Sequence, residues 1–526
     1  MRDFHMPGRS AVFAGNGLCA TSHPLAAKIA ISLLEAGGNA VDAAIGAAIL
    51  LGICEPQSTG IGGDCFALVK RPDADTFIGL NGSGRAPAGL DADTLRAEGH
   101  SKIPQHHPAA VTVPGAIDGF CRLHTDLGRL DLAEVLAPAI HYAEAGVPVA
   151  PRVAFDWTNE AQSLHGRARD FYLQNGSALK TGAMFRAPGQ AEVLRRIARE
   201  GRAGFYEGEV AEDMVASLSA LGGSHTLDDF SATACDYVTP VSTQYRGVDL
   251  IELPPNGQGA TALLLANILG HFDLSDMDPM GAARVHIEAE ATKLAYDARN
   301  RFVADLDHTN RLAHMLDPAL AKNLAGLIDP TRAMPDAKPL AEGLHKDTVY
   351  ITVVDKDRMA VSLIYSIFSA FGAGLASDRF GILFHHRGSG FNLIKGHPNE
   401  AGGGKRPLHT IIPGFLREAD GALTPFGVMG GQYQATGHTR FLSNMVDFGM
   451  DMQSAIDAPR CFAEPAGLRI ERGYAPGMRQ QLADLGHRLV IPDAPIGGAQ
   501  AIRVDMKTGV LQGASDPRKD GIALGY

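Results

Sequence analysis

Two short segments of this 526-residue chain carry residue types that acyl transfer requires. Thr348 opens the run TVYITVV, and Gly430 and Gly431 stand in GVMGGQYQATGH. A threonine hydroxyl is a weak nucleophile unless a base lies nearby. A break between Asp347 and Thr348 would create that base, because a free α-amine has a pKa of roughly 7.7–8.0. On these residues alone the plainer interpretation is favoured, in which Thr348 is a β-branched residue that begins a strand.

Other polar residues are candidates for the same site. Two adjacent glycines let backbone N–H groups approach an oxyanion closely, although Gly430–Gly431 fits a tight turn equally well. Ser366 follows Thr348 on the next expected strand, within reach of a hydrogen bond to it. The remaining candidates, each equally compatible with a structural role, are His385, His386, Arg387, His409 and Thr410. Their spacing predicts no metal site. The chain also contains no G-x-S-x-G, G-x-x-x-x-G-K-[ST] or H-E-x-x-H motif.

Two helices are predicted near the N-terminus. Ser22 is a good N-cap, Pro24 suits the first turn, and LAAKIAISLLEA repeats apolar residues at helical spacing. Asn39 is a suitable cap for VDAAIGAAILLG, which is apolar all round and therefore buried. The segment Thr59–Lys70 predicts a glycine-rich turn that leads into a strand.

The expected elements change in character near position 348. Residues 119–220 and 260–330 have helical spacing, and residues 325–346 contain three prolines without periodicity, which predicts a loop. Thr348–Ser362 alternates β-branched residues around a polar turn at residues 356–358, which predicts a hairpin. The first two thirds should therefore be helix-rich and the last third strand-rich, in an α+β layered arrangement.

Composition narrows the class of protein. The net charge is −11 without any cluster of lysines and arginines, so nucleic acid is not an expected partner. The longest apolar run, Ala43–Ile53, is too short to span a bilayer, so no membrane association is expected. The six cysteines form no C-x-x-C pair, and the N-terminus lacks the pattern of a secretory signal. Together these features predict a cytoplasmic protein with reduced thiols.

Taken in order, segments along nearly the whole chain resemble the γ-glutamyltransferase (glutathione hydrolase) family. The similar segments are SHPLAAKIAISLLEAGGNAVDAAIGAAILLGICEP, TGIGGDCF, ELPPNGQGATALLLANIL, EATKLAYDARNRF, DTVYITVVDKDRMAVSLIYSIFSAFGAG, MGGQYQATGHTRFL, AIDAPR and GASDPRKDGIALGY. The resemblance implies an α+β fold with four layers, αββα, of the N-terminal-nucleophile hydrolase type. It also implies self-cleavage into a large fragment, residues 1–347, and a small fragment, residues 348–526, which stay intertwined in one unit.

The resemblance gives the candidates their roles. Thr348 falls on the family's nucleophile, whose own α-amine acts as the base, and Asp347–Thr348 becomes the cleavage site. Ser366 falls where a hydroxyl supports the nucleophile. Gly430 and Gly431 fall on the glycines of the oxyanion hole. No metal and no organic cofactor is implied.

The substrate-binding positions depart from the family's pattern. The substituted positions are Ser83 in place of an arginine, with Arg85 two positions later, Phe368 in place of an asparagine, FHHRGSGF in place of an acidic segment, and His409 and Thr410 in place of paired serines. A γ-glutamyl head needs a cation for its carboxylate and an anion for its ammonium. This chain keeps Arg85 or Arg387 as the cation and loses the anion. With His386, His409 and Thr410 as further pocket residues, it resembles the oxamate amidohydrolase and acylase branch.

The expected function is therefore hydrolysis of a small or carboxylate-bearing amide through a threonyl acyl-enzyme. Two alternatives stay within the same chemistry, namely hydrolysis of glutathione or other γ-glutamyl amides and transfer of the acyl group to an amino-acid acceptor. A third belongs to another class: an unprocessed, non-catalytic binding protein. The expected partners are the amide substrate and the two fragments for each other, and a homodimer stays open.

Overall fold

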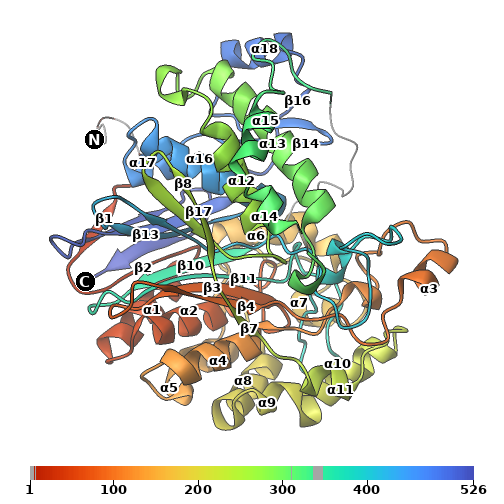
Figure 1. The fold of residues 1–526 in the computed structure, drawn as a ribbon. Coiled ribbons are helices and arrows are strands. Elements are labelled where there is room, and N and C mark those ends of the chain that lie inside the picture. Colours follow the sequence, from red (N-terminus) through yellow and green to blue (C-terminus); the bar gives the residue numbers. More distant parts are fainter. Residues whose placement is uncertain (1–4, 6–7, 310, 336–347) are drawn as a thin grey trace.

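Two stacked β-sheets with helices on both outer faces form the centre of the molecule (Figure 1). The computed structural model describes residues 5, 8–309, 311–335 and 348–526. The chain passes back and forth between the layers, so that each sheet takes strands from both sides of position 348.

The first sheet holds the beginning of the predicted small fragment. Its seven strands are all antiparallel to their neighbours. In spatial order they are β19 (Ile522–Gly525), β2 (Leu18–Thr21), β10 (Val349–Val354), β11 (Ala360–Ser366), β3 (Asp64–Lys70), β4 (Phe77–Gly82) and β7 (Asp236–Val238). The predicted hairpin after Thr348 is confirmed as β10 and β11, and the predicted strand at the end of Thr59–Lys70 is confirmed as β3.

The second sheet lies across the first and is also antiparallel throughout. In spatial order its strands are β1 (Val12–Ala14), β18 (Leu511–Ser515), β17 (Gly498–Val504), β13 (Leu423–Met429), β12 (Gly414–Arg417), β9 (Val248–Glu252) and β8 (Val241–Tyr245). Smaller sheets are β14 (Cys461–Glu464) with β15 (Gly467–Ile470) and β16 (Leu489–Val490), and β5 (Val147–Pro148) with β6 (Met184–Phe185).

Alternate side chains of a central strand pack into different apolar clusters, one between the sheets and one beneath the helices. In β3, Phe66 and Leu68 belong to the apolar cluster between the two sheets, while Cys65 and Ala67 belong to the cluster beneath the helices. Successive side chains of a strand point to opposite faces, so one strand can serve both clusters. The cluster between the sheets and a helical layer on each outer face confirm the predicted α+β arrangement of four layers, αββα.

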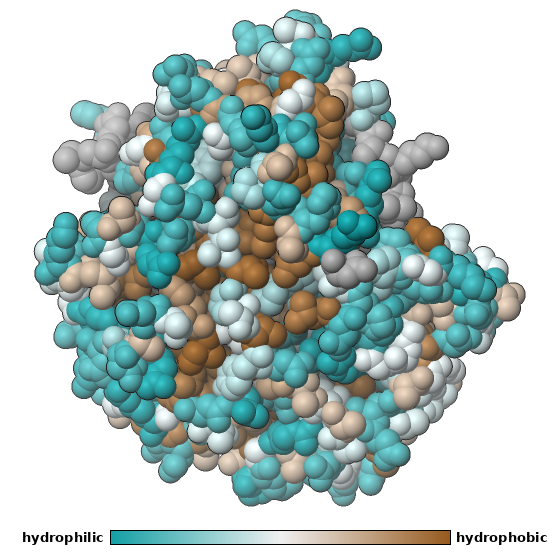
Figure 2. Space-filling model, in the orientation of Figure 1, coloured by the Kyte–Doolittle hydropathy of each residue, from teal (hydrophilic) through white to brown (hydrophobic). Residues whose placement is uncertain are grey.

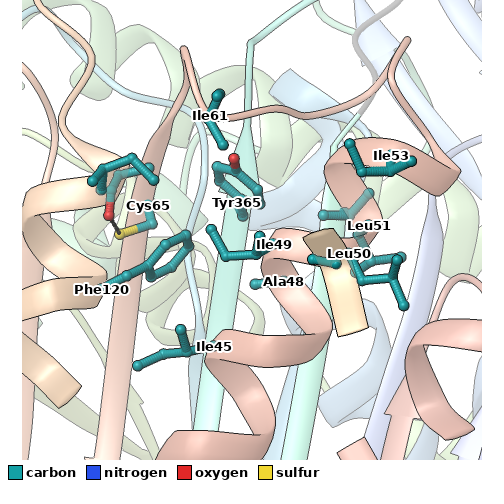
Figure 3. Packing of buried hydrophobic residues seen from close by; sticks show 14 of the residues in the cluster. Ile45, Ala48, Ile49, Leu50, Leu51, Ile53, Ile61, Cys65, Phe120 and Tyr365 are labelled. Atoms are coloured by element: carbon teal, nitrogen blue, oxygen red, sulfur yellow. Dashed lines mark hydrogen bonds between the residues drawn. The ribbon is translucent and has the colours of Figure 1, made fainter. Parts of the chain in front are cut away.

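The helices that cover the first sheet come from the first half of the chain. They are α1 (Pro24–Glu35), α2 (Ala40–Cys54), α4 (Ala116–Leu127), α5 (Leu132–Ala145), α6 (Pro151–Glu160), α7 (Ala168–Tyr172), α8 (Pro188–Glu200), α9 (Ala203–Tyr206), α10 (Gly208–Ser219) and α11 (Leu227–Ser231). Figure 3 shows Ile49 of α2 beside Phe120 of α4 and Tyr365 of β11. The rings of Phe120 and Tyr365 meet edge to face with centroids 5.2 Å apart. This core supports the strand that ends at Ser366.

The helices over the second sheet come from both sides of position 348. They are α12 (Gly259–Leu269), α13 (Ala282–Phe302), α14 (Leu312–Met315), α15 (Pro318–Ala325), α16 (Gln434–Val446) and α17 (Met452–Asp457). Two further helices are α3 (Ala92–Ala97) and α18 (Pro476–Asp484). Hydrophilic residues predominate on the face shown in Figure 2. Hydrophobic residues are visible between the upper helices and the sheets. No helix among the described residues is both long and apolar enough to cross a bilayer.

The prediction for the start of the first helix needs correction, whereas others are confirmed. The N-cap of α1 is His23, whose Nδ1 accepts the N–H of Leu25, and not Ser22, whose hydroxyl instead donates to Glu55. The prediction for Asn39 is confirmed, with a capping box to Asp42. Among the described residues, helices predominate before position 348 and strands after it, as predicted, although β1–β9 precede this position and α16–α18 follow it. Most of the predicted loop, with Asp347, lies outside the described residues.

A buried carboxyl group at the end of α2 gives the protein a pH-dependent stability. Burial raises the pKa of Glu55 from 4.5 to about 7, against the opposing influence of Lys519 and Ser22. The folded state therefore binds a proton that the unfolded chain releases between these two values. This stabilisation is complete below pH 4.5 and is lost as the pH rises through 7.

Replacing this group by its neutral isostere should remove the effect. We expect Glu55→Gln to gain stability relative to the native chain as the pH rises from about 5 to 8, because the variant has no buried charge to form. Urea unfolding midpoints across this pH range measure the difference. Two curves that run parallel would contradict the assignment.

Candidate active site

Thr348 and Ser366 face each other at one end of the hairpin. Thr348 comes directly before β10, and Ser366 is the last residue of β11. The register that pairs Val349 with Tyr365 brings the two hydroxyls together, with Thr348 Oγ1 3.2 Å from Ser366 Oγ. Both residues are buried. The contact expected from the sequence is therefore present, and it places a hydroxyl where it can orient the Thr348 side chain.

Phe368 connects this pair to Arg387. Its N–H donates to Ser366 Oγ at 2.9 Å, and its φ of +87° is rare for a residue with a side chain. The phenyl ring lies 4.4 Å from the guanidinium carbon of Arg387, a cation–π contact, and 4.9 Å from the ring of His386. Strained backbone of this kind persists only where its surroundings hold it. Here it aims the ring at the cation.

Arg387 is a buried cation with an unused binding edge. Its side chain is 1% exposed, and Nη1 donates to Thr410 Oγ1 at 3.1 Å. Nε and Nη2 have no hydrogen-bond partner among the described residues. Burial lowers the pKa of Arg387 to about 9, although Asp64 raises it. Nε–H and Nη2–H form one side of the guanidinium fork, the geometry that binds a carboxylate with two parallel hydrogen bonds.

Gly430 and Gly431 form a turn at the end of β13. Their φ values are +117° and +56°, which suit glycine. A Cβ on Gly427, three residues earlier, would lie 2.3 Å from the ring of Tyr350, so the end of β13 packs closely on the start of β10. The turn also joins the network of Arg387, because the amide nitrogen of Gln258 donates to the carbonyls of both Gly431 and Thr410.

Both oxygens of Asp64, the carboxylate of this network, already take part in hydrogen bonds. It pairs with Ser366 in the register of β3 and β11. Its Oδ1 accepts two backbone N–H groups at 3.0 Å, from Gly84 and Gly115. Its Oδ2 lies 3.1 Å from His409 Nε2. Burial opposes ionisation, but the neighbouring histidines and Arg387 outweigh it and hold the pKa of Asp64 below its usual range.

The two histidines beside Asp64 act as neutral hydrogen-bonding groups. Burial lowers the pKa of His409 to about 3 and also lowers that of His385. His385 Nε2 lies 2.8 Å from the carbonyl of Thr112, so this nitrogen carries the proton in the neutral ring. The group around Thr348 therefore contains one fixed anion and one cation with open donors.

Arg85 does not join this group. Its Nη1 lies 3.2 Å from Asp305 and 3.1 Å from the carbonyl of Gly404, and its Nη2 lies 3.6 Å from Asp236. The side chain is 38% exposed. Of the two arginines that the sequence proposed as anchors, the structure brings only Arg387 to Phe368 and Thr410.

One group of potential metal ligands exists among the described residues, formed by His286, Glu290 and His487. His286 Nδ1 and His487 Nε2 are 2.8 Å apart, at hydrogen-bonding distance. Glu290 pairs with Lys293 at 2.9 Å, and its other oxygen accepts a backbone N–H. These ligand atoms are already bonded to one another or to a cation. The group therefore serves as a joint between α13 and the segment before β16.

Some residues of the network were not singled out from the sequence. Asp64 stands in TGIGGDCF, and its signal is an acidic residue at the start of an otherwise apolar strand. Gln258 precedes α12 and resembles any polar residue near a helix start. Arg299 lies in the helical pattern of α13 and gives no signal, because its neighbours come from other segments of the chain.

Known proteins resemble this chain along nearly its whole length. A family model described as gamma-glutamyltranspeptidase matches residues 26–526. The chain is 34% identical to the glutathione hydrolase-like YwrD proenzyme of Bacillus subtilis, over 98% of this chain and 99% of that protein. It is 33% identical to the oxamate amidohydrolase proenzyme of Klebsiella pneumoniae, over 97% and 98%. A cephalosporin acylase from Bacillus halodurans superposes with a TM-score of 0.91 at 36% identity, covering 100% of this chain and 99% of that one. The chain belongs to the gamma-glutamyltranspeptidase family of N-terminal-nucleophile hydrolases.

Proposed function

We propose that this protein cuts itself between Asp347 and Thr348 and then hydrolyses small amides that carry a carboxylate but no ammonium group. The observation that carries the proposal is the open Nε–Nη2 edge of buried Arg387, connected through Phe368 to the Thr348–Ser366 pair. A desolvated cation with free donors is costly unless an anion binds there. The substrate's carboxylate supplies that anion.

The reaction follows from the position of the groups. After cleavage, the α-amine of Thr348 takes the proton of Oγ1 as this oxygen attacks the amide carbonyl carbon. Backbone N–H groups of Gly430 and Gly431 bind the oxyanion, each worth roughly 3–4 kcal/mol in comparable sites. The C–N bond then breaks as the proton passes to the leaving amine. Water attacks the resulting ester, and the carboxylic acid leaves with Thr348 restored.

The charges of the site favour this substrate class over γ-glutamyl amides. A γ-glutamyl group would bring an ammonium to the site, but both oxygens of Asp64 already take part in hydrogen bonds, with Gly84, Gly115 and His409. An unpaired buried charge costs the full desolvation penalty, about 1–3 kcal/mol or more. Relatives named as an oxamate amidohydrolase and a cephalosporin acylase support the preference, whereas relatives named as glutathione hydrolases keep the γ-glutamyl alternative open.

A matched substrate pair tests this proposal. Glutaryl and γ-glutamyl anilides differ only in the α-ammonium group. We expect the glutaryl compound to have a kcat/KM at least about tenfold higher, which corresponds to 1.4 kcal/mol. Oxamate, tested alongside, examines the shortest substrate. A preference for the γ-glutamyl anilide would sink the proposal, and acceleration by an added dipeptide would favour the transfer alternative.

A further inference from the structure

Side chains of α13 and of the N-cap of α12 form hydrogen bonds with the turn that contains Gly430 and Gly431. Gln258, the N-cap of α12, donates from Nε2 to the carbonyl of Gly431 at 3.1 Å. The hydroxyl of Tyr296 donates to the carbonyl of Gln432. Arg299 donates through Nη1 to Gln258 Oε1 at 2.9 Å and to Gln432 Oε1. Gln258 and Tyr296 thus hold the carbonyls of Gly431 and Gln432, and Arg299 holds the side chains of Gln258 and Gln432.

Arg299 has an unusual environment for a buried cation. Its side chain is 3% exposed, and its hydrogen-bond acceptors, on Gln258, Gln432 and Asn300, are all neutral amides. Among the described residues no carboxylate forms an ion pair with it. The ring of Tyr296 lies 4.3 Å from the guanidinium carbon. Burial lowers the pKa of Arg299 to about 10, so the charge persists at neutral pH.

A role in the reaction explains why a cation sits there without a counter-ion. Two successive glycines with positive φ are free to move unless something fixes them. An oxyanion hole contributes only if its donors are held in place before the charge develops. The positive charge of Arg299 also attracts the negative charge that develops on the oxyanion in the transition state.

We propose that Arg299 and Gln258 are positioning residues that hold the Gly430–Gln432 turn in the geometry that binds the oxyanion. The inference rests on the proposed function and extends it. Gln258 also contacts the residue that holds Arg387. Its Nε2 donates to the carbonyl of Thr410 at 2.7 Å, and Thr410 Oγ1 accepts from Arg387. The carboxylate anchor and the oxyanion turn are therefore joined through one amide group.

The test compares Arg299→Met with Arg301→Met on the cut enzyme. Arg301 lies on the same helix, but its side chain is 62% exposed and pairs with Asp297. We expect Arg299→Met to lower kcat about 30-fold with KM changed less than about threefold, because the brace acts on the transition state and removal of a direct donor costs 10²–10³. Arg301→Met should retain the native kcat. Binding of glutarate, measured by calorimetry, should be the same in both variants.

Arg299→Lys keeps the charge and loses the fork. It should lose about tenfold in kcat, again at constant KM, and it provides cut enzyme if Arg299→Met stays uncut. A kcat within threefold of the native value in both Arg299 variants would overturn the inference. So would a loss confined to thermal stability, since packing alone would explain it. Failure of the native chain to cut or to hydrolyse amides would refute the proposed function instead, which separates the two.

Discussion

Replacing Thr348 by alanine is expected to leave one uncut chain that hydrolyses no amide above the uncatalysed background. The variant lacks the hydroxyl that attacks the carbonyl of Asp347 and, in the mature protein, the substrate. Loss of a nucleophile in a comparable acyl-transfer site lowers kcat on the order of 10⁶-fold. Denaturing electrophoresis and hydrolysis of a glutaryl anilide measure the two effects in the same preparation.

Thr348→Ser is the matched control for this experiment. It keeps the hydroxyl and removes one methyl group, so the contact with Ser366 Oγ at 3.2 Å can still form. We expect the serine variant to cut itself and to retain measurable hydrolysis at a reduced rate. Cleavage of the alanine variant at the same position would contradict the assignment, because some other group would then be the nucleophile.

Replacing Arg387 by methionine is expected to have the second largest effect. Methionine fills the space beside Phe368 but has no donors for a carboxylate. Loss of one partner of a buried, hydrogen-bonded charge pair costs about 2–5 kcal/mol, so KM for the glutaryl anilide should rise about 100-fold. Hydrolysis of an uncharged amide of equal length should change less than about threefold, because it makes no contact with the guanidinium.

Arg85→Met decides between the two arginines. Arg85 is held by Asp305 and Asp236, so its replacement should leave KM for the carboxylate substrate close to the native value. A thermal-shift measurement gives an independent readout, since a ligand at 100 times its Kd stabilises a protein by about 2.7 kcal/mol. Glutarate should stabilise the native chain and Arg85→Met, but not Arg387→Met. The reverse pattern would make Arg85 the anchor.

The fold could be predicted largely from local signals. Asn39 with its capping box, the apolar α2 and the alternating run after Thr348 are all patterns that short segments determine. The local pattern predicts the wrong N-cap for α1, because the hydroxyl of Ser22 donates to buried Glu55, 33 residues later. A tertiary contact of this kind overrides a local preference and leaves no trace in the neighbouring sequence.

In the candidate site, too, some features follow from local sequence and others depend on tertiary contacts. Thr348, Ser366 and the paired glycines stand in segments that resemble a known family, and this resemblance singles them out, because their types alone favour no catalytic role. Whether Arg85 or Arg387 joins the group around Thr348 depends on which aspartates lie within reach of each, and these come from distant parts of the chain. The hydrogen bonds of Asp64 likewise depend on backbone groups of Gly84 and Gly115, which no side-chain pattern reveals.

The most direct test of Thr348 as an N-terminal nucleophile is the intact mass of the native protein, quenched in acid during turnover of a glutaryl anilide. We expect two chains, residues 1–347 and 348–526, with a fraction of the second heavier by one glutaryl group. Peptide mapping should place that group on Thr348. A single chain of 526 residues, a cut at another bond, or an acyl group on another residue would contradict it.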